Sequence, residues 1–167
     1  GWLAQMLAMT GDTSDYDRGD WLDTSAAVQA AVSLYGISDL RNIGAGFSET
    51  VGQVHASTAS TEALLVHGVA FGDFAGATIG SDPVKALAAS PVGRLSGTKP
   101  PLLLMHGSAD DLVSPVQSEQ MATALREREA EVDYVVVDDA GHGDGPWFQP
   151  ALIDYIVAWF SEKLVKG

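Results

Sequence analysis

Apolar residues in the second half of the chain form short runs whose length and spacing alternate between those of strands and those of helices. The segment 100–107, PPLLLMHG, is an apolar run entered through prolines, which is typical of a strand buried on both faces. The segment 132–139, VDYVVVDD, is rich in β-branched residues and predicts another strand. A helical pattern follows each strand, at 114–130 and at 150–167. This alternation predicts a parallel sheet of the α/β class.

Both helical segments carry interpretable signals. In SPVQSEQMATALREREA, Ser114 is expected to cap the first turn, Pro115 to take the first helical position and Gln117 to complete a capping box. The final segment, PALIDYIVAWFSEKLVKG, has an apolar stripe that should face the core. The stripe consists of Leu152, Tyr155, Ile156, Trp159, Phe160 and Leu164.

The first half of the chain predicts one apolar helix and one further strand. Apolar residues recur at helical spacing at Trp2, Leu3, Met6 and Leu7. Gly11 follows where this helix should stop, but no Ser, Thr, Asp or Asn precedes Trp2 to cap its start. The run AVQAAVSLYG, 27–36, predicts a third strand buried on both faces. The expected fold is therefore three parallel strands with flanking helices.

The middle of the chain has weaker signals. TEALLVHGVAF, 61–71, and DPVKALAAS, 82–90, are interpreted as short helices between glycine-rich turns. We interpret residues 44–95 as an irregular helical insertion within one domain that spans residues 1–167, since neither a repeat nor a linker is evident.

Composition and charge exclude several classes of function. A length of 167 residues suits one domain, and 46% apolar with 19% charged residues excludes a disordered chain. No apolar run approaches the ~18 residues of a membrane helix, so we expect no membrane span. Nine basic residues against 22 acidic ones, a net charge of −13, argue against a nucleic-acid partner. The chain has no cysteine, which excludes thiolate metal sites and cysteine nucleophiles but identifies no compartment.

Nothing in the sequence indicates a metal or a cofactor. The acidic loop 11–25 lacks the spacing of a calcium-binding loop. If Asp15 and Asp17 held the first and third ligand positions, Gly19 would fall at the fifth, and Ala26 would stand where the closing Glu belongs. No glycine-rich phosphate loop follows any predicted strand.

Candidate catalytic side chains follow the last two predicted strands. The loop HGSADDLVSP carries Asp110 and Asp111, and the loop DDAGHGDGPW carries His142. The carboxyl ends of parallel strands meet at one edge, so an Asp could hold the imidazole through one nitrogen and leave the other free to accept a proton. The alternative is an Asx-turn or helix-capping Asp and a His tolerated in a turn. His106 ends an apolar strand and is interpreted as structural, whereas His55 and His67 lie in the unclear middle.

The nucleophile that such a pair would need is not evident. No Gly-x-Ser-x-Gly occurs, and no serine lies on a recognisable elbow between a strand and a helix. The order in α/β-hydrolases is Ser, acid, His, so a serine is expected upstream of Asp110.

These loops carry a family likeness. HGSADDLVSP followed by AGHG resembles the acid and histidine loops of α/β-hydrolase esterases and lipases, especially the bacterial branch with feruloyl and acetyl-xylan esterases. The resemblance implies that Asp110 is the catalytic acid and His142 the catalytic base, with Asp111 the neighbour of the acid. AAVSLYGISDL and AASPVGRLSGTKPPLLLMHG resemble the preceding strand and the approach to the acid strand.

The opening also resembles the helix after a nucleophile elbow, with Trp2 in place of the usual His. The resemblance implies that Gly1 follows the elbow, with the serine three residues before it. The chain would then be the C-terminal half of an α/β-hydrolase fold, a partial domain of an enzyme of roughly 280 residues. The missing N-terminal half, as a separate chain or segment, is the expected partner. Without it, the strand at 27–36 would expose an apolar edge, and we expect no stable monomer.

The leading hypothesis is therefore a serine-dependent carboxylic ester hydrolase, acting on a small-molecule ester once the missing half is present, with the fragment alone inactive. Trp2, Phe71, Phe74 and Trp147 are candidates to line its substrate pocket, although core placement is the common role of such aromatics. A peptidase of the prolyl-oligopeptidase type or an arylformamidase would have similar loops. A non-catalytic α/β binding module is the remaining alternative.

Overall fold

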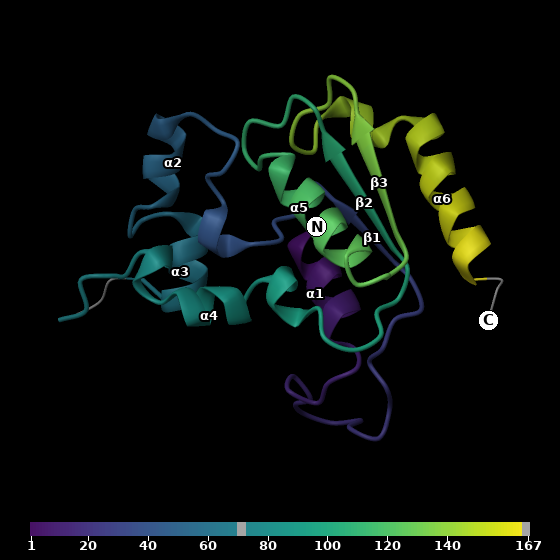
Figure 1. The fold of residues 1–167 in the computed structure, drawn as a ribbon, viewed down its shortest axis with the longest axis horizontal. Helices are drawn as coiled ribbons and strands as arrows, with labels where there is room; N and C mark the ends of the chain where they lie inside the picture. The colour runs from purple at the N-terminus through teal and green to yellow at the C-terminus, as the bar shows by residue number, and fades with distance from the viewer. Residues whose placement is uncertain (70–72, 165–167) are drawn as a thin grey trace.

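The computed structural model describes residues 1–69 and 73–164 (Figure 1). Among these residues, three strands form one parallel sheet in the order β1–β2–β3. Their bounds are Ala31–Leu34 for β1, Leu102–Gly107 for β2 and Val132–Val137 for β3. Leu102 pairs with Ala31 on one side and with Val132 on the other, so the three strands start level. The predicted parallel α/β sheet is confirmed.

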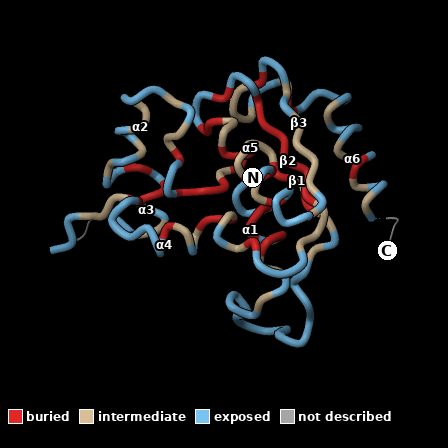
Figure 2. Tube along the Cα trace, viewed as in Figure 1, coloured by how far each residue is buried: buried red, intermediate tan, exposed pale blue. Residues whose placement is uncertain are grey.

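Helices cover both faces of this sheet. Helices α1 (Trp2–Thr10) and α5 (Val116–Arg126) pack on the face that holds Leu102 and Leu104. Helix α6 (Pro150–Leu164) packs on the opposite face, over Leu103 and Met105. Every residue of β2 is buried (Figure 2), because alternate side chains of this middle strand enter two different cores. The molecule therefore has three layers, with β2 at the centre.

A group of short helices lies to one side of the sheet (Figure 1). Its members are η1 (Leu40–Asn42), α2 (Glu49–His55), α3 (Thr61–His67), η2 (Ile79–Ser81), α4 (Pro83–Ala88) and η3 (Pro91–Arg94). The side chains of Ser48, Ser60 and Asp82 cap α2, α3 and α4. Helices α3 and α4 confirm the two predicted short helices, whereas α2, which contains Gly52, was not predicted.

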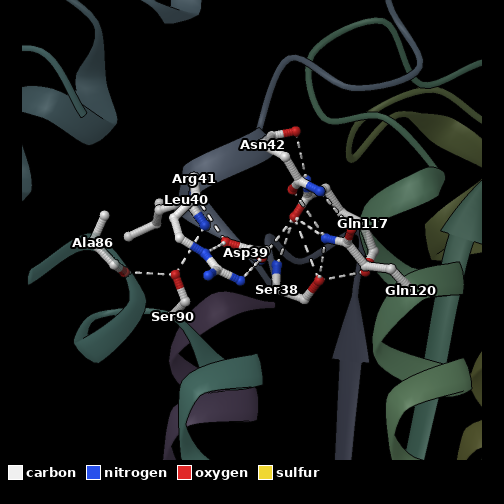
Figure 3. Close-up of polar contacts among 9 residues, drawn as sticks. All are labelled: Ser38, Asp39, Leu40, Arg41, Asn42, Ala86, Ser90, Gln117 and Gln120. Carbon is white, nitrogen blue, oxygen red and sulfur yellow. Dashed lines mark hydrogen bonds and ion pairs between the residues drawn. The ribbon is translucent and has the colours of Figure 1, made fainter. Parts of the chain in front are cut away.

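A buried polar network fastens this group to α5 (Figure 3). The Gln117 side-chain oxygen accepts hydrogen bonds from the backbone N–H groups of Ser38 (3.0 Å) and Asp39 (2.9 Å). The Ser38 hydroxyl donates to the Gln117 carbonyl at 2.5 Å. On the other side, the Leu40 N–H donates to the Ser90 hydroxyl, which donates to the Ala86 carbonyl. The chain after β1 is thus held between α5 and the end of α4.

This network corrects one sequence prediction. The capping box is wrong, because α5 begins at Val116 and the Gln117 side chain binds residues 38, 39 and 42 rather than Ser114. The Ser114 hydroxyl instead accepts from the Val116 N–H at 3.3 Å. Tertiary partners thus outcompete the local cap for the glutamine side chain.

Two apolar patterns were also predicted too broadly. The strand at 27–36 is paired only over Ala31–Leu34, and its residues alternate between buried and half-buried because β1 is an outer strand of the described sheet. On α6, the core contacts come from Leu152, Ile156, Trp159 and Phe160. Tyr155 and Leu164 of the predicted stripe are exposed. No helix of the described residues is long and apolar enough to cross a membrane.

Candidate active site

The Asp110 carboxylate is fully buried in the loop that follows β2. Its Oδ1 accepts hydrogen bonds from the backbone N–H groups of Leu112 (3.0 Å) and Val113 (2.9 Å). Its Oδ2 lies 2.9 Å from Nδ1 of His142. Asp110 therefore does both things considered from the sequence: Oδ1 closes a turn, and Oδ2 holds the imidazole of His142. An ionised carboxylate, with acceptor sites on both oxygens, suits this set of N–H donors.

His142 lies in the loop that follows β3, and its side chain is 27% exposed. Because the Asp110 carboxylate accepts this hydrogen bond, Nδ1 carries the proton. Nε2 is therefore the unprotonated nitrogen of the neutral ring. Among the described residues, Nε2 has no hydrogen-bond partner. The imidazole is thus oriented by a carboxylate and presents a basic nitrogen, which is the arrangement of a general base.

The loop around His142 is held rigidly. The Gly141 N–H donates to the Asp144 carboxylate at 2.9 Å, and the Trp147 indole N–H donates to the Gly141 carbonyl at 2.8 Å. Gly143 has a φ of 70°, a conformation that glycine adopts without steric cost. These contacts fix the backbone on both sides of His142.

Tyr35, directly after β1, packs against the imidazole. The centroids of the Tyr35 and His142 rings are 4.5 Å apart, and the Trp147 ring meets the Tyr35 ring edge to face with centroids 4.8 Å apart. Tyr35 has a φ of 44°, unusual for a residue other than glycine. Sequence reasoning did not assign Tyr35 to the site; the available signal was its position in a Tyr-Gly turn at the end of a strand.

His106 has a structural role. It is fully buried, and its Nε2 lies 2.8 Å from the Val113 carbonyl, which can only accept, so Nε2 carries the proton. Nδ1 then accepts from the Ser118 hydroxyl at 2.7 Å. Burial lowers the pKa of His106, against a smaller opposing effect of its hydrogen bond to Val113 and the nearby Asp110 charge. Nε2 of His106 also lies 3.3 Å from Asp110 Oδ2.

The N-terminal end of α1 reaches the same edge of the sheet. A Cβ atom at Gly36 would lie 2.7 Å from the Gly1 carbonyl carbon and 2.5 Å from Nε2 of Gln5, too close for any side chain. Glycine at position 36 therefore lets α1 approach the turn that contains Tyr35. The start of α1, Tyr35 and His142 form a continuous line of contacts along this edge.

The aromatic residues proposed as pocket lining lie in different surroundings. Trp147 is buried in the core and contacts Tyr35. Trp2 lines an apolar cavity, and Phe74 is exposed. Phe71 lies outside the described residues. Within the described chain, no group of three or more His, Asp or Glu side chains could hold a metal ion.

The layered parallel sheet, with Asp110 and His142 in contact at its carboxyl edge, is the arrangement expected of part of an α/β-hydrolase fold. The prolyl oligopeptidase family matches residues 78–167, more than half of the chain, and the chain therefore belongs to this family of the serine hydrolase superfamily. No curated protein matches the sequence.

Solved structures share the fold at low sequence identity. A truncated carbohydrate esterase from gut microbiota is 20% identical with a TM-score of 0.78, over 96% of this chain and 55% of its own. The acetyl ester-xyloside bifunctional hydrolase of Caldicellulosiruptor lactoaceticus is 20% identical, with a TM-score of 0.62, over 96% and 52%. The acylaminoacyl peptidase of Pyrococcus horikoshii is 19% identical, with a TM-score of 0.61, over 98% and 22%. The chain thus spans about half, or less, of the length of these relatives.

Proposed function

We propose that this chain carries the acid and the base of a serine-dependent carboxylic ester hydrolase. The observation that carries the proposal is the 2.9 Å contact between Asp110 Oδ2 and His142 Nδ1, which leaves Nε2 available for a proton. Asp110 orients the ring and stabilises the imidazolium that forms during the reaction.

The serine comes, in this proposal, from a segment that precedes α1 or from a separate chain. Two observations support this: the chain spans about half the length of its structural relatives, and the start of α1 lies at the edge occupied by Tyr35 and His142. A nucleophile placed just before α1 would lie on the same edge as Nε2. The first half of the fold would also bring the N–H groups that bind the oxyanion.

The reaction then follows in two stages. His142 Nε2 accepts the serine proton as the hydroxyl oxygen attacks the ester carbonyl, and the imidazolium returns that proton to the leaving alcohol. Water attacks the acyl-enzyme with His142 again as the base, which releases the carboxylic acid and restores the serine. Both stages proceed without a metal or a cofactor.

An ester is the favoured substrate because two of the compared structures are carbohydrate or acetyl esterases. The family name and the acylaminoacyl peptidase keep peptide-bond hydrolysis as the second candidate. The loops that carry Asp110 and His142 would also suit an arylformamidase. The remaining alternative is a non-catalytic α/β binding module, which would need neither a serine nor a substrate.

The test is hydrolysis by this chain combined with the segment that carries the nucleophile. We expect p-nitrophenyl acetate to be hydrolysed and His142→Ala to lower kcat by at least ~10³-fold. The control is His67→Ala, a histidine of α3 outside the site, which should retain activity. Unchanged activity in His142→Ala would refute the mechanism. An inert wild-type complex would favour the binding module, and preference for an N-acylated dipeptide or an N-formyl arylamine would favour the peptidase or the arylformamidase.

A further inference from the structure

An apolar cavity of about 390 Å³ lies between the start of α1 and the group of short helices. Its walls include Trp2 from α1, Leu40 from η1, Leu65 and Val66 from α3 and Ala89 after α4. This volume is at the lower end of the range of ~300–1,000 Å³ typical of small-molecule sites. The cavity could therefore hold a compact apolar group.

The walls of the cavity are fixed by specific contacts. The Trp2 indole N–H donates to the Ala89 carbonyl at 3.0 Å, which holds the ring against the end of α4. Glu62, also a lining residue, is buried and pairs through its carboxylate with His55 Nδ1 at 2.7 Å. Its carboxylate is thus hydrogen-bonded to the His55 ring. Leu65 lines the cavity yet is 81% exposed, as expected of a residue at its mouth.

The cavity is linked to the candidate active site through the backbone of α1. Trp2 follows Gly1, whose backbone packs against Gly36, and the ring of the preceding Tyr35 contacts His142. Figure 1 shows the N-terminal end of α1 between the sheet and the short helices. A group bound near the start of α1 would have the cavity on one side and His142 on the other.

We propose that this cavity binds the acyl group of the ester substrate, and that the preferred acyl group is an aliphatic chain longer than acetyl. This assignment rests on the proposed function. The leaving alcohol must receive its proton from His142 and therefore departs on the histidine side. The acyl group stays bound to the serine ahead of α1, next to Trp2, and extends into the cavity.

The test compares esters that differ only in the acyl chain, in the complex of this chain with the nucleophile segment. We expect kcat/KM to be at least ~10-fold higher for p-nitrophenyl hexanoate than for the acetate, because a methylene in a fitted pocket is worth ~10-fold or more. Leu65→Trp should narrow the mouth and lower kcat/KM for the hexanoate by ~10-fold or more. The loss for the acetate should be at least ~5-fold smaller than for the hexanoate, because the shorter acetyl group fills less of the cavity. Since Leu65 is largely exposed, the variant is expected to fold.

Leu22→Trp is the matched control, since Leu22 is 60% exposed and outside this cavity. It should change neither rate. Equal loss on both esters with Leu65→Trp, or no loss on either, would overturn the proposal. In a series of acetate esters with alcohols of increasing length, a loss of kcat/KM in Leu65→Trp that grows with the length of the alcohol would show that the cavity binds the alcohol. That result would also overturn the proposal.

Hexanoate binding separates this proposal from the proposed function. In the wild-type protein, added hexanoate should shift the methyl NMR signals of Leu65 and Val66, and Leu65→Trp should weaken this binding. If the complex hydrolyses no ester but hexanoate shifts these signals, the proposed function fails and the cavity stands as a site for aliphatic acyl groups. If hexanoate shifts neither signal, the cavity proposal fails whatever the activity.

Discussion

At the scale of single residues, Asp110 joins the backbone of its own loop to the imidazole of another. Oδ1 closes the turn through Leu112 and Val113, and Oδ2 receives His142 and lies 3.3 Å from the buried His106. The carboxylate is therefore held before any substrate arrives, and it determines which nitrogen of His142 carries the proton. Such preorganisation favours the transition state because the groups need not rearrange during the reaction.

Asp110→Asn should separate the two roles of Asp110, which are to close its own loop and to orient His142. The asparagine Oδ1 can still accept from the Leu112 and Val113 N–H groups, so the loop should keep its shape. Its amide N–H₂ would face His142 Nδ1 and favour the wrong tautomer, and we expect kcat for ester hydrolysis to fall by ~10⁴-fold. Asp111→Asn, at the exposed neighbouring carboxylate, is the matched control and should leave kcat within about twofold. A small loss in Asp110→Asn with an unchanged circular dichroism spectrum would contradict the assigned role.

His106 should make the protein less stable in acid. Its pKa is lowered by burial, so between the lowered value and the ordinary value of 6.5 the unfolded chain binds a proton that the folded chain does not. The stability linked to this group is therefore present above about pH 6.5 and declines as the pH falls, by at most ~1.4 kcal/mol per pH unit.

Urea unfolding at pH 7.5 and 5.5 measures this contribution. The wild type should lose more free energy of unfolding between the two values than His106→Gln, in which glutamine can replace both neutral hydrogen bonds but cannot be protonated. His67→Gln, on α3, is the control and should behave as the wild type does. Equal losses in the wild type and in His106→Gln would show that His106 is not the linked group.

The sequence placed Asp110 and His142 on one edge because the spacing of a single βαβ unit determines where its loops lie. Tyr35 could not be assigned in the same way. An aromatic residue at the end of a strand has the same local pattern whether it enters the core or contacts a catalytic ring. Only the pairing of both β1 and β3 with β2 brings it beside His142.

At the scale of elements, α5 fixes the position of the chain after β1. Gln117 of α5 is buried and accepts from two backbone N–H groups, at Ser38 and Asp39, whereas Gln120 lies one turn later and is half-buried. The local sequence around Gln117 is typical of a capping box. A side chain near a helix start can nevertheless form its hydrogen bonds with groups distant in the sequence, as Gln117 does. Short-range rules could therefore predict the start of α5 to within one residue, but they could not predict which groups its glutamine side chain binds.

Gln117→Leu should destabilise the protein more than Gln120→Leu. Leucine leaves the N–H groups of Ser38 and Asp39 without an acceptor, and each buried unsatisfied group costs ~1–3 kcal/mol. We therefore expect a loss of about 2–6 kcal/mol for Gln117→Leu and less than ~1 kcal/mol for Gln120→Leu, measured by urea titration. Losses of similar size in the two variants would show that the network is not anchored at Gln117.

At the scale of the whole molecule, the described surface has an open sheet edge beside exposed apolar side chains. Within the described residues, β1 pairs only with β2, so its outer edge presents unpaired backbone groups. Helix α1, which packs on β1, exposes Leu3 (62%) and Leu7 (47%) one helical turn apart. Apolar stripes and open edges of this kind are usually covered by another chain or segment.

We therefore expect the chain alone to associate and to become more stable when a completing segment covers this surface. Sedimentation velocity of the chain by itself should show mass that rises with protein concentration, with binding of a dye that reports exposed apolar surface. The double substitution Leu3→Lys and Leu7→Glu should reduce both, because a charge on each residue opposes burial of the stripe. Val54→Lys on α2 and Val84→Glu on α4 together are the control, since both residues are exposed away from β1. A chain that stays monomeric at ~100 μM and binds no dye would contradict this expectation. It would show that the unpaired edge of β1 does not drive association.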